Sequence, residues 1–154
     1  MIDHEKLTTR RARIGDLSRL LELLADDNLG KNREAIGSRE ACYVLAFNAI
    51  DSVINQYLLV GELEGSVIAM LQLTFIPGLS RRGALRANIE AVRVDNGLRG
   101  QGIGSWLMQQ AILLAGERNC GLVQLTSDKT RAEAHRFYTR LGFVGSHEGF
   151  KLKP

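Results

Sequence analysis

The 154-residue chain has little cysteine, few aromatic residues and no long apolar run. No stretch of eighteen apolar residues occurs, so the sequence predicts no membrane span. Residues 1–6 carry no apolar secretory core, and we therefore expect a cytoplasmic protein. The only two cysteines, Cys42 and Cys120, are better explained as thiols in a reducing compartment than as a disulfide.

Metal ligands and nucleic-acid motifs are also missing. The histidines, at positions 4, 135 and 147, are scattered, and neither they nor the cysteines have the spacing of a metal site. Arginines cluster at residues 10–13 and 81–86, and the formal charge is +3. Because only 6% of residues are aromatic and no nucleic-acid-binding motif is present, we interpret these clusters as a solvated strand and a solvated loop. We expect neither a metal nor a nucleic-acid partner.

The composition is that of one ordinary folded domain. Apolar residues make up 45% of the chain and charged residues 24%, and no repeat, linker or low-complexity tract is present. A chain of this length can bury a substantial core. We therefore expect a single domain over residues 1–154.

Hydrophobic periodicity predicts an α/β fold in the order β-α-α-β-β-β-α-β-α-β-β. The expected strands lie at 7–14, 56–62, 66–75, 89–94, 122–126, 143–144 and 149–152, and the expected helices at 17–24, 40–54, 103–118 and 132–141. A short glycine-containing loop at 63–65 favours an antiparallel hairpin. The helix after the fourth strand crosses over to a parallel strand. The sheet should thus be mixed, mostly antiparallel and flanked by helices.

A glycine-rich loop lies between the strand expected at 89–94 and the helix expected from Ile103. Glycine has no Cβ, so such a loop can turn tightly and let a ligand approach its amides. Free amides at a helix start favour an anion. The ATP-binding loop would need a lysine after its last glycine, and a dinucleotide loop would need glycine in place of Ser105. The loop therefore predicts an anion site of a different kind.

Two motifs resemble those of the GCN5-related N-acetyltransferases (GNAT). The run Arg-Gly-Gln-Gly-Ile-Gly at 99–104 is similar to the family's acetyl-CoA pyrophosphate loop. Phe-Tyr at 137–138, followed by Gly-Phe at 142–143, is similar to its closing motif Phe-Tyr-x-x-x-Gly-Phe. The resemblance covers nearly the whole chain and implies the same element order. It also implies that the strands flanking the loop part to admit the pantetheine arm of acetyl-CoA.

For the acetyl donor, acetyl-CoA, the candidate contacts come from one strand, the loop and the start of one helix. They are Val92, Arg93, Val94, Arg99, Gly100, Gln101, Gly102, Ile103, Gly104, Ser105 and Arg131. Backbone amides from 99 to 105 would hold the pyrophosphate, and Arg99 would aim at a phosphate. The resemblance implies that the backbone of Val92 and Val94 pairs with pantetheine. Arg131 stands where family members often carry asparagine, and a phosphate would offset its unfavourable charge at a helix start.

Acetyl transfer to an amine also needs a base and a stabilised leaving thiolate. Glu90 is the candidate base, since burial within an apolar strand would raise its pKa; the alternative is an ion pair with Arg86 or Arg93. Tyr138 matches the tyrosine that lies near the thioester sulfur in the family, and its phenol can donate a proton. The alternative for Tyr138 is a core aromatic.

The acceptor is described less well by the motifs. Asp26 and Asp27 follow the first expected helix, where similar proteins form a wall of the acceptor site, and their carboxylates would attract a cationic amine; solvated turn residues are the alternative. We expect a small-molecule amine acceptor. A protein N-terminus or lysine, a non-catalytic acyl-CoA sensor, and a homodimeric assembly also remain open.

Overall fold

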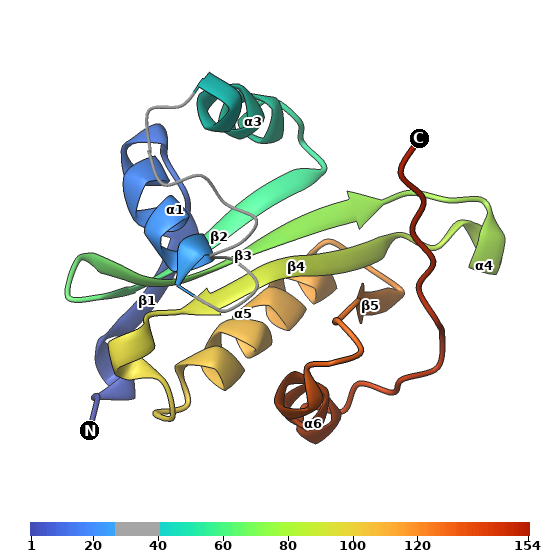
Figure 1. Cartoon of the computed structure of the whole chain (residues 1–154). Coiled ribbons are helices and arrows are strands. Elements are labelled where there is room, and N and C mark those ends of the chain that lie inside the picture. Colours follow the sequence, from blue (N-terminus) through green and yellow to red (C-terminus); the bar gives the residue numbers. More distant parts are fainter. Residues whose placement is uncertain (27–40) are drawn as a thin grey trace.

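The computed structural model describes residues 1–26 and 41–154 and is built on one five-stranded sheet (Figure 1). The strands lie side by side in the order β1 (Leu7–Arg11), β2 (Gln56–Leu63), β3 (Ser66–Ile76), β4 (Arg86–Val94) and β5 (Leu122–Leu125). Neighbouring strands are antiparallel, except that β5 is parallel to β4. The mixed sheet predicted from the sequence is confirmed.

Helices cover both faces of the sheet. In Figure 1, α1 (Leu17–Ala25) and α3 (Ala41–Asp51) lie on one face, and α5 (Ile103–Glu117) and α6 (Ala132–Arg140) lie on the other. Short turns complete the described chain: η1 (His4–Lys6), η2 (Ile14–Asp16), α4 (Ser80–Gly83) and η3 (Asn96–Leu98). Among the described residues, no helix combines the length and apolar character needed to cross a bilayer.

Each face of the sheet has its own apolar core. On the α5 side, Ile103, Leu107 and Ala111 pack against alternate residues of β3 such as Leu71 and Leu73. The spacing of four along α5 puts these three residues on one stripe, as the sequence predicts. On the opposite side, residues of α1 and α3 pack on β2 and β3: Leu20, Leu23, Phe47, Val60 and Met70. Burying such a side chain contributes about 1.5–3 kcal/mol.

Strand β4 carries an irregularity next to the candidate site. Its register against β3 shifts between Met70 and Gln72, and Ala91 has φ 55°, in the left-handed region. Such a bulge places one extra residue on one strand and re-aims the side chains beside it. Glu90 pairs with Gln72, and after the shift Arg93 pairs with Met70.

Strands β4 and β5 pair over only half of β4. The ladder joins Arg86 to Leu122 and ends where Ile89 meets Leu125. β4 continues to Val94, so residues 90–94 have no β5 partner on that edge. This agrees with the parting of the strands that the family resemblance implies, and it places the start of the parting at Glu90.

The last expected hairpin does not form. The segments 143–144 and 149–152 contain no strand, and Val144, Phe150 and Leu152 are 82–91% exposed. Strands of two to four residues offer few ladder bonds to offset the entropy of ordering, and the backbone bonds of Phe143 and Ser146 are local. The first strand is also shorter than expected, because the chain turns into η2 after Arg13.

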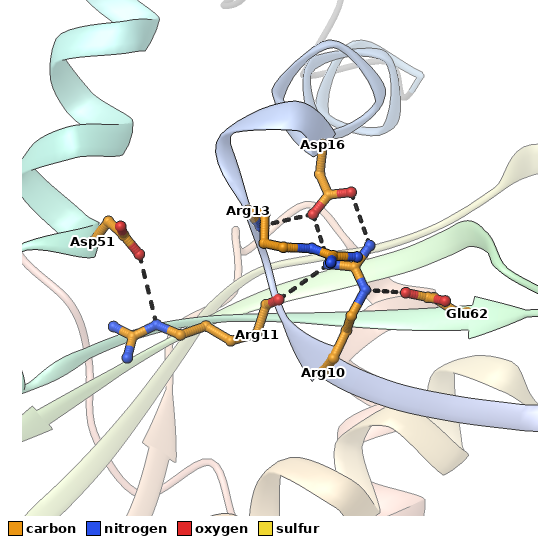
Figure 2. Close-up of polar contacts among 6 residues, drawn as sticks. All are labelled: Arg10, Arg11, Arg13, Asp16, Asp51 and Glu62. Atoms are coloured by element: carbon orange, nitrogen blue, oxygen red, sulfur yellow. Dashed lines mark hydrogen bonds and ion pairs between the residues drawn. The ribbon is translucent and has the colours of Figure 1, made fainter.

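In the N-terminal arginine cluster (Arg10, Arg11 and Arg13), Arg10 and Arg11 pair with carboxylates, whereas the side chain of Arg13 is exposed as expected. Figure 2 shows the Arg10 guanidinium between Asp16 and Glu62. Its fork reaches the two oxygens of Asp16 at 2.7 and 2.9 Å. Hydrogen bonds from Arg10 and from the Arg13 amide hold the pKa of Asp16 below its usual value. Arg11 reaches Asp51 more loosely, at 3.8 Å.

Candidate active site

A cavity of about 780 Å³ lies where β4, the glycine-rich loop and α6 meet. This is within the usual size of a small-molecule or cofactor site. Its lining contains the candidate cofactor residues Val92, Arg93, Val94, Arg99, Gly100, Gly102, Ile103, Gly104, Ser105 and Arg131, together with Tyr138. The structure thus brings the two sequence motifs to one place.

The loop has the backbone shape that its glycines suggest. Gly100 and Gly102 have φ of 78° and 80°, which side chains with a Cβ rarely adopt. Gly102 is the N-cap of α5, so the first free amides of a fifteen-residue helix border the cavity. A Cβ on Gly102 would also come within 3.2 Å of the His4 ring.

Gln101 turns away from the cavity and anchors the loop. Its side-chain oxygen accepts a hydrogen bond from the amide of Ile2 at 3.0 Å, and its carbonyl oxygen lies 2.7 Å from Nε2 of His4. Gln101 is not among the residues that line the cavity. That the backbone amide of Gln101 binds the cofactor remains a prediction.

A close approach of two helices explains why the two motifs occur together. A Cβ built on Gly104, in the first motif, would lie 3.4 Å from Cζ of Phe137, in the second. Glycine at this position lets α6 pack against the start of α5. Tyr138 then lies beside the loop, with its ring edge-on to Phe137 and Phe143 at centroid distances of 5.2 and 6.1 Å.

Tyr138 is held in its protonated form. Burial raises the pKa of Tyr138 above its usual value, although the positive charges of Arg131 and Arg93 act in the opposite direction. A neutral phenol at the wall of the cavity can donate a proton or a hydrogen bond to a group inside it.

The unpaired edge of β4 offers backbone carbonyls to the cavity. The amide of Asp95 bonds to Ile68 of β3, so the polar groups of the preceding residue, Val94, point the other way. Arg93 donates to the carbonyl of Val92 at 2.9 Å, and Arg99 donates to that of Val94 at 3.4 Å. The two residues whose backbone is predicted to pair with pantetheine thus have carbonyls that accept side-chain donors, and guanidinium groups fill that role.

Arg99 also joins the loop to the end of α1. Its terminal nitrogens donate to Oδ1 of Asn96 and to the backbone carbonyl of Asp26, each at 3.0 Å. A second connection runs from Arg19 of α1 to Asp95, whose other oxygen accepts the amide of Gly97 at 2.9 Å. The Arg19 hydrogen bond lowers the pKa of Asp95. The phosphate contact predicted for Arg99 remains a prediction.

The cavity is strongly basic. Five arginines line it, with Glu133 as the single carboxylate: Arg93, Arg99, Arg131, Arg136 and Arg140, called here the cavity arginines. The sequence interpretation did not include Arg136 and Arg140. They are four residues apart on either side of Tyr138 and therefore lie on one face of α6. This spacing in the sequence could have indicated that both arginines lie near the site.

Glu90 is exposed, and the expectation that it is buried is wrong. It pairs across the ladder with Gln72, lies outside the cavity lining, and is on the sheet face opposite to that of its buried neighbour Ile89. Of its alternative partners, Arg86 donates to Gln124 and Arg93 to the carbonyl of Val92. Glu90 lies where the parting of β4 and β5 begins, two residues before Val92.

The remaining predictions concern the acceptor and metals. Asp26 is the C-cap of α1, and Asp27 lies outside the described residues. Within residues 1–26 and 41–154, no group of histidine, cysteine and carboxylate side chains could hold a metal ion. Nor does a disulfide join Cys42 to Cys120.

Comparisons with known proteins agree with this geometry. The model of the acetyltransferase (GNAT) family matches residues 18–143. A transcriptional regulator from Bacillus halodurans C-125 is 47% identical, with a TM-score of 0.92 over 96% of this chain and 99% of its own. A putative acetyltransferase from Agrobacterium tumefaciens is 28% identical, with a TM-score of 0.85 over the same shares.

A predicted acetyltransferase from Clostridium acetobutylicum, solved with acetyl-CoA, is 20% identical with a TM-score of 0.72 over 96% of both chains, which shows the same fold. A search of curated protein sequences finds no match. Since the family model spans most of the chain and both motifs meet at one cavity, the chain belongs to the GNAT family of acetyltransferases.

Proposed function

We propose that this acetyltransferase transfers the acetyl group of acetyl-CoA to the primary amine of a small molecule. The observation that carries the proposal is the basic cavity at which the glycine loop, the unpaired edge of β4 and Tyr138 meet. A thioester-activated acetyl group is the chemistry that acetyl-CoA supplies.

The donor side follows from the residues of the cavity. The amides of the loop at the start of α5 hold the pyrophosphate, and the cavity arginines attract the phosphates. The carbonyls of Val92 and Val94 accept the pantetheine amides once Arg93 and Arg99 release them. Two strongly charged guanidinium groups then become available to phosphate.

The chemical step uses one group on each side of the β4 edge. Glu90, on the α1 and α3 side, takes the proton of the acceptor ammonium, directly or through water. Tyr138, on the cavity side, donates a hydrogen bond or a proton to the departing thiolate. Because burial raises its pKa, Tyr138 keeps that proton at neutral pH. Asp26 adds negative charge on the acceptor side.

A different candidate is an acyl-CoA sensor without catalytic activity. It is favoured by the relative of 47% identity, which is described as a transcriptional regulator. A sensor would bind acetyl-CoA in the same cavity, and neither Glu90 nor Tyr138 would be needed. Acetylation of a protein amine is a variant of the proposed reaction.

A screen of primary amines with acetyl-CoA, read by release of free thiol, separates these candidates. The screen is run with the wild type and with Glu90→Gln, which keeps the shape and removes the basicity. General-base loss should lower turnover about a hundred- to ten-thousandfold, leave acetyl-CoA affinity unchanged and matter less at high pH. Glu64→Gln, at the β2–β3 turn, is the control and should have wild-type activity.

Two results would contradict the proposal. Tight acetyl-CoA binding without acetylation of any amine favours the sensor. Acetylation by Glu90→Gln at the wild-type rate near neutral pH assigns the base to another residue.

A further inference from the structure

A row of polar side chains crosses four strands of the sheet on the same face as Glu90. Gln56 pairs with Thr74, Thr74 with Asn88, and Asn88 with Gln124, in one continuous register from β2 to β5. Most residues beside the row on these strands belong to the apolar cores. We call these four residues, with the adjacent Gln72, the polar row.

The members of the row bind one another. Thr74 and Gln72 each donate to Oε1 of Gln56 at 3.0 Å, and Gln124 donates to Oδ1 of Asn88 at 3.4 Å. All are partly exposed. Side-chain amides and a hydroxyl held in this way present donors and acceptors without net charge. The row is therefore a neutral hydrogen-bonding surface.

One charge of each sign borders the row along β4. Glu90 follows Asn88 by two residues and Arg86 precedes it by two, so all three side chains lie on one face. At about 3.4 Å per residue, the two charges are about 14 Å apart along the strand. Arg86 donates to Oε1 of Gln124 at 3.3 Å, and within residues 1–26 and 41–154 it forms no ion pair.

We propose that the polar row is the acceptor-binding surface, and that the acceptor is an extended polar amine with an anionic group at its far end. This rests on the proposed function, since Glu90 must mark the reacting amine. Hydroxyl or amide groups in the middle of the molecule bind the row, and a carboxylate or phosphate binds Arg86. The guanidinium group of an arginine can bind a carboxylate or a phosphate through two parallel hydrogen bonds, so the structure accommodates either anion.

The position of the row relative to the cavity supports this assignment. The cavity borders β4 from Val92 onward, whereas the row borders β4 up to Glu90. The pairing with β5 ends between them, at Ile89. An acceptor that lies along the row therefore brings its amine to the point where the donor's acetyl group can pass between the strands.

The test uses two matched pairs of amines in the acetylation assay. Triglycine is compared with triglycine amide, and 6-aminohexyl phosphate with 6-aminohexanol. We expect the anionic member of at least one pair to have a kcat/KM at least tenfold higher than its neutral partner. The pair that shows the preference identifies carboxylate or phosphate as the anion.

Variants of Arg86 assign the preference to that residue. Arg86→Gln should abolish the preference and leave the KM for acetyl-CoA unchanged, and Arg86→Lys should keep part of it. Asn88→Leu should raise the KM of both members of the triglycine pair, because it removes a contact with the middle of the molecule. Arg13→Gln, at an exposed position beyond the end of β1, is the charge control and should have no effect.

The outcomes distinguish this inference from the proposed function. Equal acetylation within both pairs, or a preference that survives Arg86→Gln, overturns the inference and leaves the acetyltransferase function intact. If no amine is acetylated, calorimetry with the CoA-loaded protein measures whether the row binds triglycine or 6-aminohexyl phosphate. Binding of triglycine or 6-aminohexyl phosphate that Arg86→Gln removes supports the row as a ligand site, and no binding of either overturns it.

Discussion

The two ends of the sheet use arginine in opposite ways. At the β1–β2 end, Arg10 lies between the carboxylates of Asp16 and Glu62, and all three side chains are mostly buried. At the β4–β5 end, five cavity arginines surround a space with one carboxylate, and Arg93 and Arg99 donate to backbone carbonyls. In the first set one arginine meets two carboxylates, whereas in the second set arginines outnumber carboxylates five to one.

The comparison shows that arginine clusters in a sequence have to be interpreted with their partners. Residues 10–13 are the denser cluster along the chain, yet their main role is structural. The cavity arginines are spread over residues 93–140 and become a cluster only in the fold. Substitutions at the first end should therefore change stability, and those at the second end should change binding or turnover.

The largest effect is expected for Gly102→Val. A β-branched side chain is strained at φ 80° and would meet His4, and it would also crowd the amides that face the cavity. Acetyl-CoA affinity measured by calorimetry should fall more than a hundredfold. Gly145→Val, where a Cβ meets open space, is the control. A folded Gly102→Val protein with normal affinity would show that the loop does not bind the cofactor.

Tyr138→Phe should lower kcat about a hundredfold, the lower end of what a general acid contributes. The ring keeps its packing against Phe137 and Phe143, so the melting temperature should change little. Because the pKa of Tyr138 is raised, the wild type should keep its activity up to a pH above 10, the usual value for tyrosine. A variant that melts early and keeps full turnover in its folded fraction would make Tyr138 structural.

Asp16→Asn should destabilise the protein by about 2 kcal/mol, because it leaves Arg10 with a weaker partner in a partly buried site. Denaturation at neutral pH measures this, and kcat should be unchanged. Asp51→Asn is the matched control, since its 3.8 Å pair is exposed and is worth about 0.5 kcal/mol or less. Equal losses of unfolding free energy in the two variants would show that the Arg10–Asp16 pair stabilises the fold no more than the exposed Arg11–Asp51 pair.

The same pair predicts a pH dependence. The pKa of Asp16 is lower in the folded chain than its usual 3.8, so the folded state binds this proton less readily than the unfolded state. Its stabilising contribution is complete above pH 4 and is lost as the pH falls through the folded value. The stability difference between wild type and Asp16→Asn should shrink below pH 4.

The smallest effect is expected at a cavity arginine. Arg136→Gln should weaken acetyl-CoA binding about fivefold at low ionic strength, and the effect should decline with added salt. Arg11→Gln carries the same charge change at the other end and should leave the affinity unchanged. A similar loss from both variants would indicate a general charge effect instead of a local contact.

Local patterns in the sequence were sufficient for the fold and for the backbone shape of the glycine loop. The four-residue spacing after Ile103 predicted the buried stripe of α5, and the glycines at 100 and 102 predicted the loop whose left-handed dihedrals the structure shows. Both patterns depend on residues that are near one another in the chain.

Properties that depend on distant residues were predicted poorly. Glu90 was expected to be buried because its neighbours Ile89 and Ala91 are apolar, but exposure depends on which elements cover the sheet. The polar row joins four strands, so no single stretch of sequence displays it. The hairpin expected after Phe143 had suitable residues, but its segments meet no strand edge in the fold.

The hydrogen bonds of Arg99 connect the two sides of the proposed active site. One side chain reaches both the Val94 carbonyl, on the proposed donor side, and the Asp26 carbonyl, at the end of α1 on the proposed acceptor side. Acetyl-CoA that takes over the Val94 carbonyl changes the contacts of the same guanidinium that holds α1. Under the proposed function, donor binding is thus coupled to the end of α1, and thermodynamic reciprocity requires an acceptor bound there to change donor affinity by the same factor. A donor affinity that saturating amine leaves unchanged would show that Arg99 does not couple the two sides.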